Sequence, residues 1–276
     1  MNEKIGIIGF GNMGAAIGEA IKKEYRVRVF DKDRNKTDNL VGITVEDGTQ
    51  ELIADSEILI LAVKPQDFDH VLKEIKSKVP GKLIISIAAG ISTAHIEKIL
   101  GNIRVVRAMP NLGVKIRESV TCICKGIFAS EADRGFADEL FGRVGVTRVI
   151  EESMMDAATA ISGSGPGYIF DYLDKEHIET LHIPEHTRHV LRMRLEKAAE
   201  EVGFSHDDAV FLAVNTANAA MNIISKAKLS PAELRSQVAS KGGTTEAGLA
   251  VLNKGGTWEE AAQAALKRAR ELAKGN

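Results

Sequence analysis

The chain has 276 residues, 44% of them apolar, which is enough to bury a sizeable core and predicts two domains. Lysine and arginine total 36 against 38 aspartate and glutamate, and this net charge of −2 argues against nucleic-acid binding and favours a small-molecule ligand. No segment is long and apolar enough to span a membrane and the start carries no signal-peptide pattern, so we expect a soluble, cytoplasmic protein with no membrane partner.

The first predicted elements form a dinucleotide-binding unit. An apolar run, Lys4 to Ile8, predicts a buried strand that leads into the GxGxxG pattern of residues 9–14; a helix over Ala15 to Lys22 and a strand over Arg26 to Phe30 follow. The first glycine permits a tight turn, the second lets the backbone approach a pyrophosphate, and the third lets the helix lie on the sheet. Asp31 stands where a carboxylate accepts a hydrogen bond from the ribose 2′-hydroxyl. A glycine turn without a ligand is the alternative.

Further strands and helices alternate up to about residue 150. Strand-like runs lie at Glu57–Val63, Lys82–Ile87, Ile103–Met109, Val120–Cys124 and Val146–Ile150, and helical patterns at Thr93–Leu100 and Glu131–Phe141. This alternation is typical of an α/β fold with a doubly wound parallel sheet of the Rossmann type. Cys122 and Cys124 share one face of their strand, so we expect buried side chains there rather than a redox or metal-binding pair.

Three strands end in small or polar residues at the sheet edge where such folds bind their ligands. The segments are Ala62-Val63-Lys64-Pro65, Ser86-Ile87-Ala88-Ala89-Gly90 and Arg107-Ala108-Met109-Pro110-Asn111. We expect them to line one crevice. Lys64 is placed to face a cofactor there, and a solvated lysine before a turn-forming proline is the alternative.

A second domain of helices is predicted over residues 152–276, after a first domain over residues 1–151, because β-branched runs give way to long stretches of Ala, Leu and Glu. Residues 257–260 resemble a capping box, which leaves Trp258 a packing role. Two glycine-rich segments, 162–167 and 240–245, each stand before a helix and offer N–H groups and hydroxyls suited to a carboxylate. Ordinary interhelical turns with N-caps are the alternative.

Taken together, five segments resemble those of the pyrroline-5-carboxylate reductase family, in the family's order and over nearly the whole chain. They are residues 9–14, 62–65, 109–111, 162–166 and 242–245. The resemblance implies an N-terminal Rossmann domain and a C-terminal all-helical dimerisation domain, in a homodimer or a higher homo-oligomer. It also implies an enzyme that reduces 1-pyrroline-5-carboxylate to L-proline with NAD(P)H, the last step of proline biosynthesis.

The resemblance also implies roles for individual residues. The cofactor would be held by Gly9, Phe10, Gly11, Asn12, Met13, Gly14, Ala62, Val63, Lys64, Pro65, Ala88 and Ala89, with Asp31 at the ribose. The substrate would be held by Asn111, Ser240, Gly243, Thr244 and Thr245. A protonated imine is already electrophilic, so positioning is the main requirement and no metal is needed. The Thr245 hydroxyl is the candidate for a catalytic hydrogen bond to the ring nitrogen.

At two short segments the sequence departs from the family's pattern, which limits how far the family's residue roles apply to this chain. Leu112-Gly113 stands where the family usually has Thr-Pro, which leaves the shape of that loop and its effect on activity open. Asp31 stands where many members have a residue that accepts a 2′-phosphate. Its carboxylate would repel that phosphate, whereas Lys32 and Arg34 could meet it. The cofactor is therefore expected to be NADH or NADPH, with Asp31 favouring NADH.

The third departure is an insert from Asp174 to about Met193, which contains four of the seven histidines. His182 and His186 have a spacing that can bind a metal on a helix, but Pro184 lies between them and no further ligand completes the set. We therefore predict no metal site and interpret the insert as a solvated or interface extension; an engineered or aberrant segment is the alternative.

Two other classes of function stay open at this point. The chain could be a reductase of another cyclic imine or a hydroxy acid on the same fold, although no Gly-xxx-Asn-xxx-Lys pattern of the hydroxy-acid enzymes is found. It could also be a catalytically silent dinucleotide sensor or scaffold, against which the intact segment 242–245 argues, because a sensor needs no carboxylate site.

Overall fold

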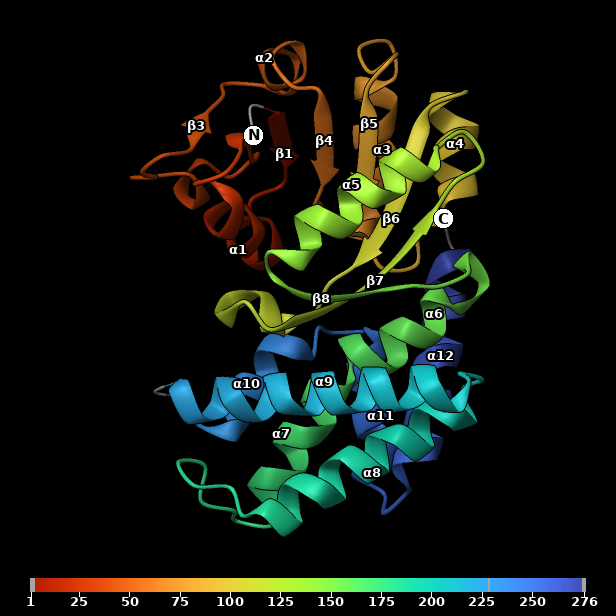
Figure 1. Cartoon of the computed structure of the whole chain (residues 1–276). Coiled ribbons are helices and arrows are strands. Elements are labelled where there is room, and N and C mark those ends of the chain that lie inside the picture. The colour runs from red at the N-terminus through yellow and green to blue at the C-terminus, as the bar shows by residue number, and fades with distance from the viewer. Residues whose placement is uncertain (1–2, 228, 275–276) are drawn as a thin grey trace. The chain divides into compact units, whose positions relative to one another are not determined.

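The computed structural model describes residues 3–227 and 229–274, which divide into two compact units (Figure 1). Unit 1 holds the chain up to Ala108 together with Cys122–Glu152, and unit 2 holds Met109–Thr121 and the chain from Ser153 onward. Within the described ranges, no helix combines the length and the apolar character needed to cross a bilayer.

An eight-stranded sheet in the order β3-β2-β1-β4-β5-β6-β7-β8 forms the first half of the fold (Figure 1). The strands are β1 (Lys4–Ile8), β2 (Arg26–Phe30), β3 (Thr44–Val45), β4 (Ile58–Leu61), β5 (Leu83–Ser86), β6 (Arg104–Met109), β7 (Ser119–Lys125) and β8 (Gly145–Val149). Every pairing from β3 to β6 is parallel, which confirms the Rossmann-type sheet. The sequence predicted a sheet that is parallel throughout, and this part of the prediction is wrong. The connection from β6 to β7 is too short for a parallel crossover, so β7 runs antiparallel to β6.

Helices of unit 1 bury apolar side chains against these strands. They are α1 (Asn12–Ile21), α2 (Thr49–Ala54), α3 (Pro65–Ile75), α4 (Thr93–Leu100) and α5 (Glu131–Gly142). β4 and β5 are buried at every position, as expected for parallel strands covered on both faces, and their side chains share one core with Phe68 of α3 and Ile96 of α4.

The two cysteines lie inside β7 as predicted. Cys122 and Cys124 are both buried and neither forms a disulfide. Burial is the main reason that the pKa of the Cys124 thiol rises to about 12. A thiol with so high a pKa carries almost no thiolate at neutral pH, so these side chains act as small apolar groups.

Unit 2 is helical, as predicted. Its helices are α6 (Met155–Ala158), α7 (Gly165–Lys175), α8 (Glu185–Glu201), α9 (His206–Lys226), α10 (Pro231–Val238), α11 (Thr244–Leu252) and α12 (Trp258–Lys274). The predicted capping box before α12 is present, because the Thr257 N–H donates to Glu260 at 2.8 Å and the Glu260 N–H donates to the Thr257 hydroxyl at 3.2 Å. Trp258 is 5% exposed and packs edge-on against Tyr168, which confirms its packing role.

Residues 109–121 belong to unit 2, although the sequence placed all of residues 1–151 in the first domain. The reason is a set of contacts with α9. Glu118, which lies between β6 and β7, accepts hydrogen bonds from Asn222 at 2.6 Å and from Lys226 at 3.1 Å. The predicted domain boundary was placed where the β-branched runs end, and that criterion does not detect an earlier segment that packs with the second unit.

The glycine-rich segment 162–167, which was expected to stand before a helix, runs from a π-helical turn into the first residues of α7. A π-helical turn, Thr159–Gly163, joins α6 to α7, and the Ser164 N–H donates to the Thr159 carbonyl at 3.0 Å, five residues back. Pro166 then lies in the first turn of α7, where its missing N–H leaves no hydrogen bond unmade. Single π turns are frequent at functional sites.

Candidate active site

The glycines of the first loop create an open backbone surface before α1. Gly9 has a φ of +94°, and a Cβ there would lie 2.7 Å from the Ala62 carbonyl oxygen. A Cβ at Gly14 would collide with the Gly9 carbonyl oxygen, so this glycine lets α1 lie directly on the turn. A Cβ at Gly11, the N-cap of α1, would meet nothing within 4 Å. Free N–H groups at a helix start facing open space suit a pyrophosphate, so these residues fit a dinucleotide.

A cavity of about 570 Å³ opens beside this loop. Of the residues predicted to hold a cofactor, those that line it are Gly9, Gly11, Asp31, Ala62, Val63 and Lys64. Phe10, Asn12, Met13, Gly14, Pro65, Ala88 and Ala89 are not among its lining residues. Two of these have a visible local role, since Gly14 contacts the turn and Pro65 begins α3 directly after the N-cap Lys64. Of the three strand ends expected to line one crevice, the segment after β4 lines this cavity, together with the glycine loop after β1; no residue of 86–90 or 107–111, after β5 and β6, is among its lining residues.

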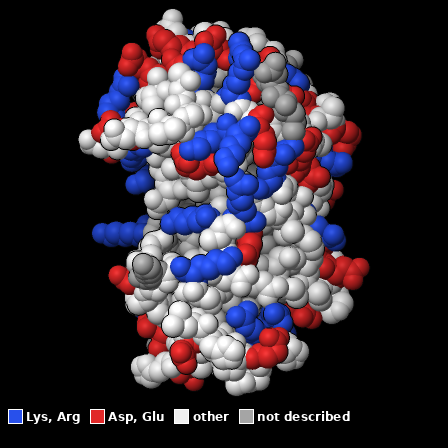
Figure 2. All heavy atoms as spheres, turned by 60° about the vertical axis from the view of Figure 1, so that its left-hand side comes forward, with Lys and Arg blue, Asp and Glu red and all other residues white. Residues whose placement is uncertain are grey.

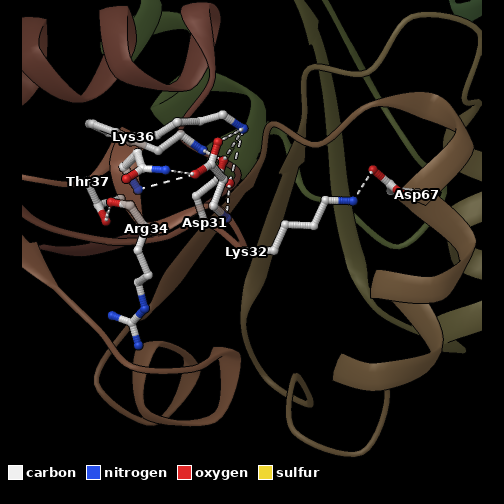
Figure 3. Close-up of polar contacts among 9 residues, drawn as sticks. Asp31, Lys32, Arg34, Lys36, Thr37 and Asp67 are labelled. Carbon is white, nitrogen blue, oxygen red and sulfur yellow. Dashed lines mark hydrogen bonds and ion pairs between the residues drawn. The ribbon is translucent and has the colours of Figure 1, made fainter.

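Asp31 lines this cavity, and several polar contacts hold its side chain (Figure 3). It is 7% exposed, and its carboxylate accepts hydrogen bonds from the N–H groups of Phe10 at 2.7 Å and Asp33 at 2.8 Å. The Lys36 ammonium lies 3.2 and 3.4 Å from its two oxygens. Burial alone would raise the pKa of Asp31, but the two N–H donors and Lys36 together lower it, so the side chain is ionised at neutral pH.

The two cations that the sequence offered for a 2′-phosphate are both paired elsewhere. Lys32 lies 2.9 Å from Asp67 of α3, and Arg34 turns away from Asp31 to a contact of 2.8 Å with Asp47 (Figure 3). The sequence did not single out Lys36, which a short 3-10 turn, Arg34–Lys36, brings back over the carboxylate. Over unit 1, in the upper part of Figure 2, basic side chains lie among acidic ones.

Four of the five predicted substrate residues, Ser240, Gly243, Thr244 and Thr245, lie at the start of α11 or just before it. This helix begins at Thr244, inside the glycine-rich segment 240–245 that was expected to precede it, so both threonines lie in its first turn. Gly243 is the N-cap and offers no side chain of its own. A Cβ at Gly243 would collide with the Ser240 hydroxyl, so glycine lets that hydroxyl approach the helix start closely. The result is a helix N-terminus surrounded by hydroxyls, which is a surface suited to a carboxylate.

A cluster of hydroxyls joins α11 to the π turn before α7. The Thr245 hydroxyl donates to the Ser164 hydroxyl at 3.1 Å, and the Thr244 hydroxyl lies 3.1 Å from the same oxygen. Thr245 is 4% exposed and Ser164 is fully buried. A Cβ at Gly167 would lie 2.5 Å from the Thr245 methyl group, so this glycine lets α7 and α11 pack closely. Ser164 was seen in the sequence only as part of a glycine-rich segment, because nothing there pairs it with residues about 80 positions away.

Asn111 is buried and ties the β6–β7 connection to the π turn. Its side-chain oxygen accepts from the N–H groups of Gly113 at 3.0 Å and Val120 at 3.2 Å, and its side-chain nitrogen donates to the Ser162 carbonyl at 3.1 Å. The loop with Leu112-Gly113 is therefore an ordered 3-10 turn held by Asn111. A contact of Asn111 with the substrate stays a prediction.

The histidines of the predicted insert do not assemble a metal site with other ligands. Among the described residues, the one group of metal-ligating type is Glu196, Glu200 and His206, which lies outside the insert. The pKa of His206 is raised mainly by its hydrogen bond to Glu200, so this group forms an ordinary surface ion pair. The insert itself spans the end of α7, residues 176–184 and the start of α8.

Comparisons with known proteins cover both units. Residues 4–90 match the family model described as NADP oxidoreductase coenzyme F420-dependent, and residues 190–272 match that of pyrroline-5-carboxylate reductase dimerisation. The pyrroline-5-carboxylate reductase of Aquifex aeolicus is 33% identical over 92% of this chain and 90% of that protein, and that of Methanosarcina acetivorans is 32% identical over 99% of both. The solved 1-pyrroline-5-carboxylate reductase from Streptococcus pyogenes is 27% identical, covers 98% of this chain and 99% of its own, and has a TM-score of 0.65.

Proposed function

Because the chain belongs to the pyrroline-5-carboxylate reductase family, we propose that it reduces 1-pyrroline-5-carboxylate to L-proline with a reduced nicotinamide dinucleotide, the last step of proline biosynthesis. The observation that carries this proposal is the hydroxyl-rich start of α11, where Thr244 and Thr245 meet Ser164. A dinucleotide-binding loop alone is shared by many dehydrogenases. A helix start with clustered hydroxyls adds what a small cyclic carboxylate requires.

Unit 1 would hold the cofactor. The N–H groups that follow Gly11 would hold the pyrophosphate, and Asp31, with Lys36 against it, would lie beside the adenosine ribose. Ala62, Val63 and Lys64 would border the cofactor along the cavity. When bound, the reduced nicotinamide supplies the hydride that the imine carbon accepts. The cofactor is NADH or NADPH, and the Lys36 contact weakens the case for NADH that Asp31 made in the sequence.

Unit 2 would hold the substrate. The first N–H groups of α11, with the Ser240 and Thr244 hydroxyls, would bind the carboxylate, since negative charge is stabilised at a helix N-terminus. The Thr245 hydroxyl would hydrogen-bond the ring nitrogen, and Asn111 would hold the π turn in place through its hydrogen bond to the Ser162 carbonyl. Holding the electrophilic carbon in one orientation is the main catalytic requirement, because a protonated imine needs no further activation.

We also propose that the enzyme works as a homodimer or a larger homo-oligomer, assembled through unit 2. The match of residues 190–272 to a dimerisation domain supports this. Light scattering on the purified protein, with and without cofactor, measures the mass directly. A monomeric mass in the fully active enzyme would contradict it.

The first experiment follows the absorbance of NADH and, separately, NADPH with racemic 1-pyrroline-5-carboxylate, and confirms proline as the product. Oxidation that depends on the imine and yields proline is the expected result. Cofactor binding without oxidation would favour a silent sensor or scaffold. Oxidation with another cyclic imine or a hydroxy acid, but not with 1-pyrroline-5-carboxylate, would favour a different reductase on the same fold.

A further inference from the structure

The Asp31 carboxylate has no free acceptor position while Lys36 lies against it (Figure 3). A carboxylate offers about four lone-pair positions. The N–H groups of Phe10 and Asp33 use one on each oxygen, and the Lys36 ammonium lies within hydrogen-bonding distance of both oxygens. A ribose hydroxyl therefore reaches this carboxylate only if Lys36 moves away.

The charge of Asp31 is balanced in the same arrangement. A bare carboxylate at this position would repel a 2′-phosphate. Here the Lys36 ammonium cancels that charge at 3.2 Å and also lines the cavity, with 41% of its side chain exposed. Lys32 lines the cavity as well but is engaged by Asp67 at 2.9 Å. Arg34 does not line it. Lys36 is thus the cation that combines contact with Asp31 and access to the cavity.

We propose that Lys36 sets the cofactor choice of this chain: it neutralises Asp31 and presents its ammonium to a 2′-phosphate, so that NADPH is accepted at least as well as NADH. This proposal depends on the proposed function at one point, namely that the cavity binds a nicotinamide dinucleotide. An ammonium–phosphate contact is a charge-assisted hydrogen bond, the stronger kind. With NADH, the ribose hydroxyls compete with Lys36 for the same two oxygens, so binding of this cofactor includes the cost of displacing the ammonium.

The test uses two adenosine fragments that carry no nicotinamide. Calorimetric titration gives the dissociation constants of adenosine 2′,5′-bisphosphate and of 5′-AMP for the natural chain and for Lys36→Gln. We expect the bisphosphate to bind the variant ~10-fold more weakly or worse, as for loss of one charge-assisted contact. Binding of 5′-AMP should stay within about threefold or tighten, because Asp31 is then free for the ribose.

Arg34→Gln is the matched control, since it removes the same charge from the same turn at a residue that contacts Asp47 instead. It should leave the ratio of the two dissociation constants unchanged, and Lys36→Arg should restore bisphosphate binding. An equal loss in Arg34→Gln and Lys36→Gln would overturn the proposal, because the effect would then be long-range charge. A natural chain that binds 5′-AMP more tightly than the bisphosphate would also overturn it. Neither fragment reports on imine reduction, so failure of the reductase assay would leave these outcomes distinct.

Discussion

Thr245 is the residue on which the proposed chemistry depends most directly. Its hydroxyl now donates to Ser164, and Thr244 lies beside the same oxygen, so the position of the hydroxyl is fixed before any ligand binds. Thr245→Val keeps the shape and removes the hydroxyl. We expect kcat/KM for the imine to fall by roughly ten- to a hundredfold, as for loss of one hydrogen bond to a charged group, with the KM for the cofactor unchanged.

Steady-state kinetics of Thr245→Val and Thr245→Ser separates the two possible roles of the residue. The serine variant keeps the hydroxyl and should recover most of the activity. Unchanged kcat and KM in the valine variant would show that the ring nitrogen finds its partner elsewhere.

Asp31 should contribute to stability in a pH-dependent way. The pKa of Asp31 is lowered in the folded chain. Its ionised form therefore stabilises the fold fully above the usual carboxyl pKa of about 3.9, and this stabilisation is lost as the pH falls through the lower pKa of the folded chain. Asp31→Asn should lower the free energy of unfolding by ~2 kcal/mol at pH 7, because two N–H donors and Lys36 lose a charged acceptor.

Urea unfolding of the natural chain and of Asp31→Asn, at several pH values between 8 and 5, measures this difference. It should be constant over that range, since the carboxylate stays ionised throughout. A difference that shrinks between pH 7 and pH 5 would mean that the pKa of Asp31 is raised rather than lowered.

The contrast between Asp31 and Lys36 shows which single residues a sequence can reveal. Asp31 follows a glycine loop and a strand at a fixed spacing, and that regularity marked it as a candidate cofactor residue; in the structure it lines the cavity beside the glycine loop. Lys36 reaches the same place through a short 3-10 turn, and Ser164 meets Thr245 across two helical segments. Contacts of this kind depend on turn geometry and on packing between distant segments, for which the sequence offers no periodic signal.

At the level of elements, the packing of α11 on α7 should control substrate binding. A Cβ at Gly167 would lie 2.5 Å from the Thr245 methyl group, so the helices must separate to accept it. Gly167→Ala should lower the free energy of unfolding by ~1–3 kcal/mol through overpacking, and should raise the KM for the imine while the KM for the cofactor stays constant.

Gly163→Ala provides the control in the same segment. A Cβ there would meet the Thr159 methyl group at 3.7 Å, an ordinary contact, so this variant should be as stable as the natural chain or more stable by ~0.5–1 kcal/mol. Thermal melts and steady-state kinetics of both variants measure the effects. If both alanines behaved alike, the close approach of the two helices would have no special role.

Helices and strands with a clear hydrophobic periodicity or a capping residue were predicted well. Elements that depend on pairing or packing with distant segments were not. The helices Thr93–Leu100 and Glu131–Gly142 lie within one residue of their predicted bounds, because each follows a serine N-cap and carries an apolar face. The two-residue strand β3 was missed, since its pairing with β2 is its only distinguishing feature. The antiparallel β7 and the π turn before α7 follow from connection length and from packing, which periodicity does not report.

For the molecule as a whole, each unit has its own chemistry, and the ligands should reveal this separately. The dinucleotide contacts proposed here lie in unit 1, at residues 9–14 and 31–36. The carboxylate contacts lie in unit 2, at residues 240–245, and the hydroxyl cluster ties them to the π turn. A cofactor and a substrate should therefore slow hydrogen exchange in different parts of the chain.

Hydrogen–deuterium exchange with mass spectrometry can test this division with one ligand at a time. At a concentration of about 100 times its Kd, a ligand stabilises the bound form by about 2.7 kcal/mol. Amides that exchange only after the ligand has dissociated should therefore exchange up to ~100-fold more slowly. NADPH alone should protect peptides containing residues 9–14 and 31–36, and L-proline alone should protect those containing 240–250 and 159–167. Protection of residues 9–14 by proline alone would contradict the assignment, since proline has no part that resembles a pyrophosphate. A cofactor that protected neither peptide of unit 1 would show that the cavity beside Gly9 is not its binding site, whatever the enzyme's activity.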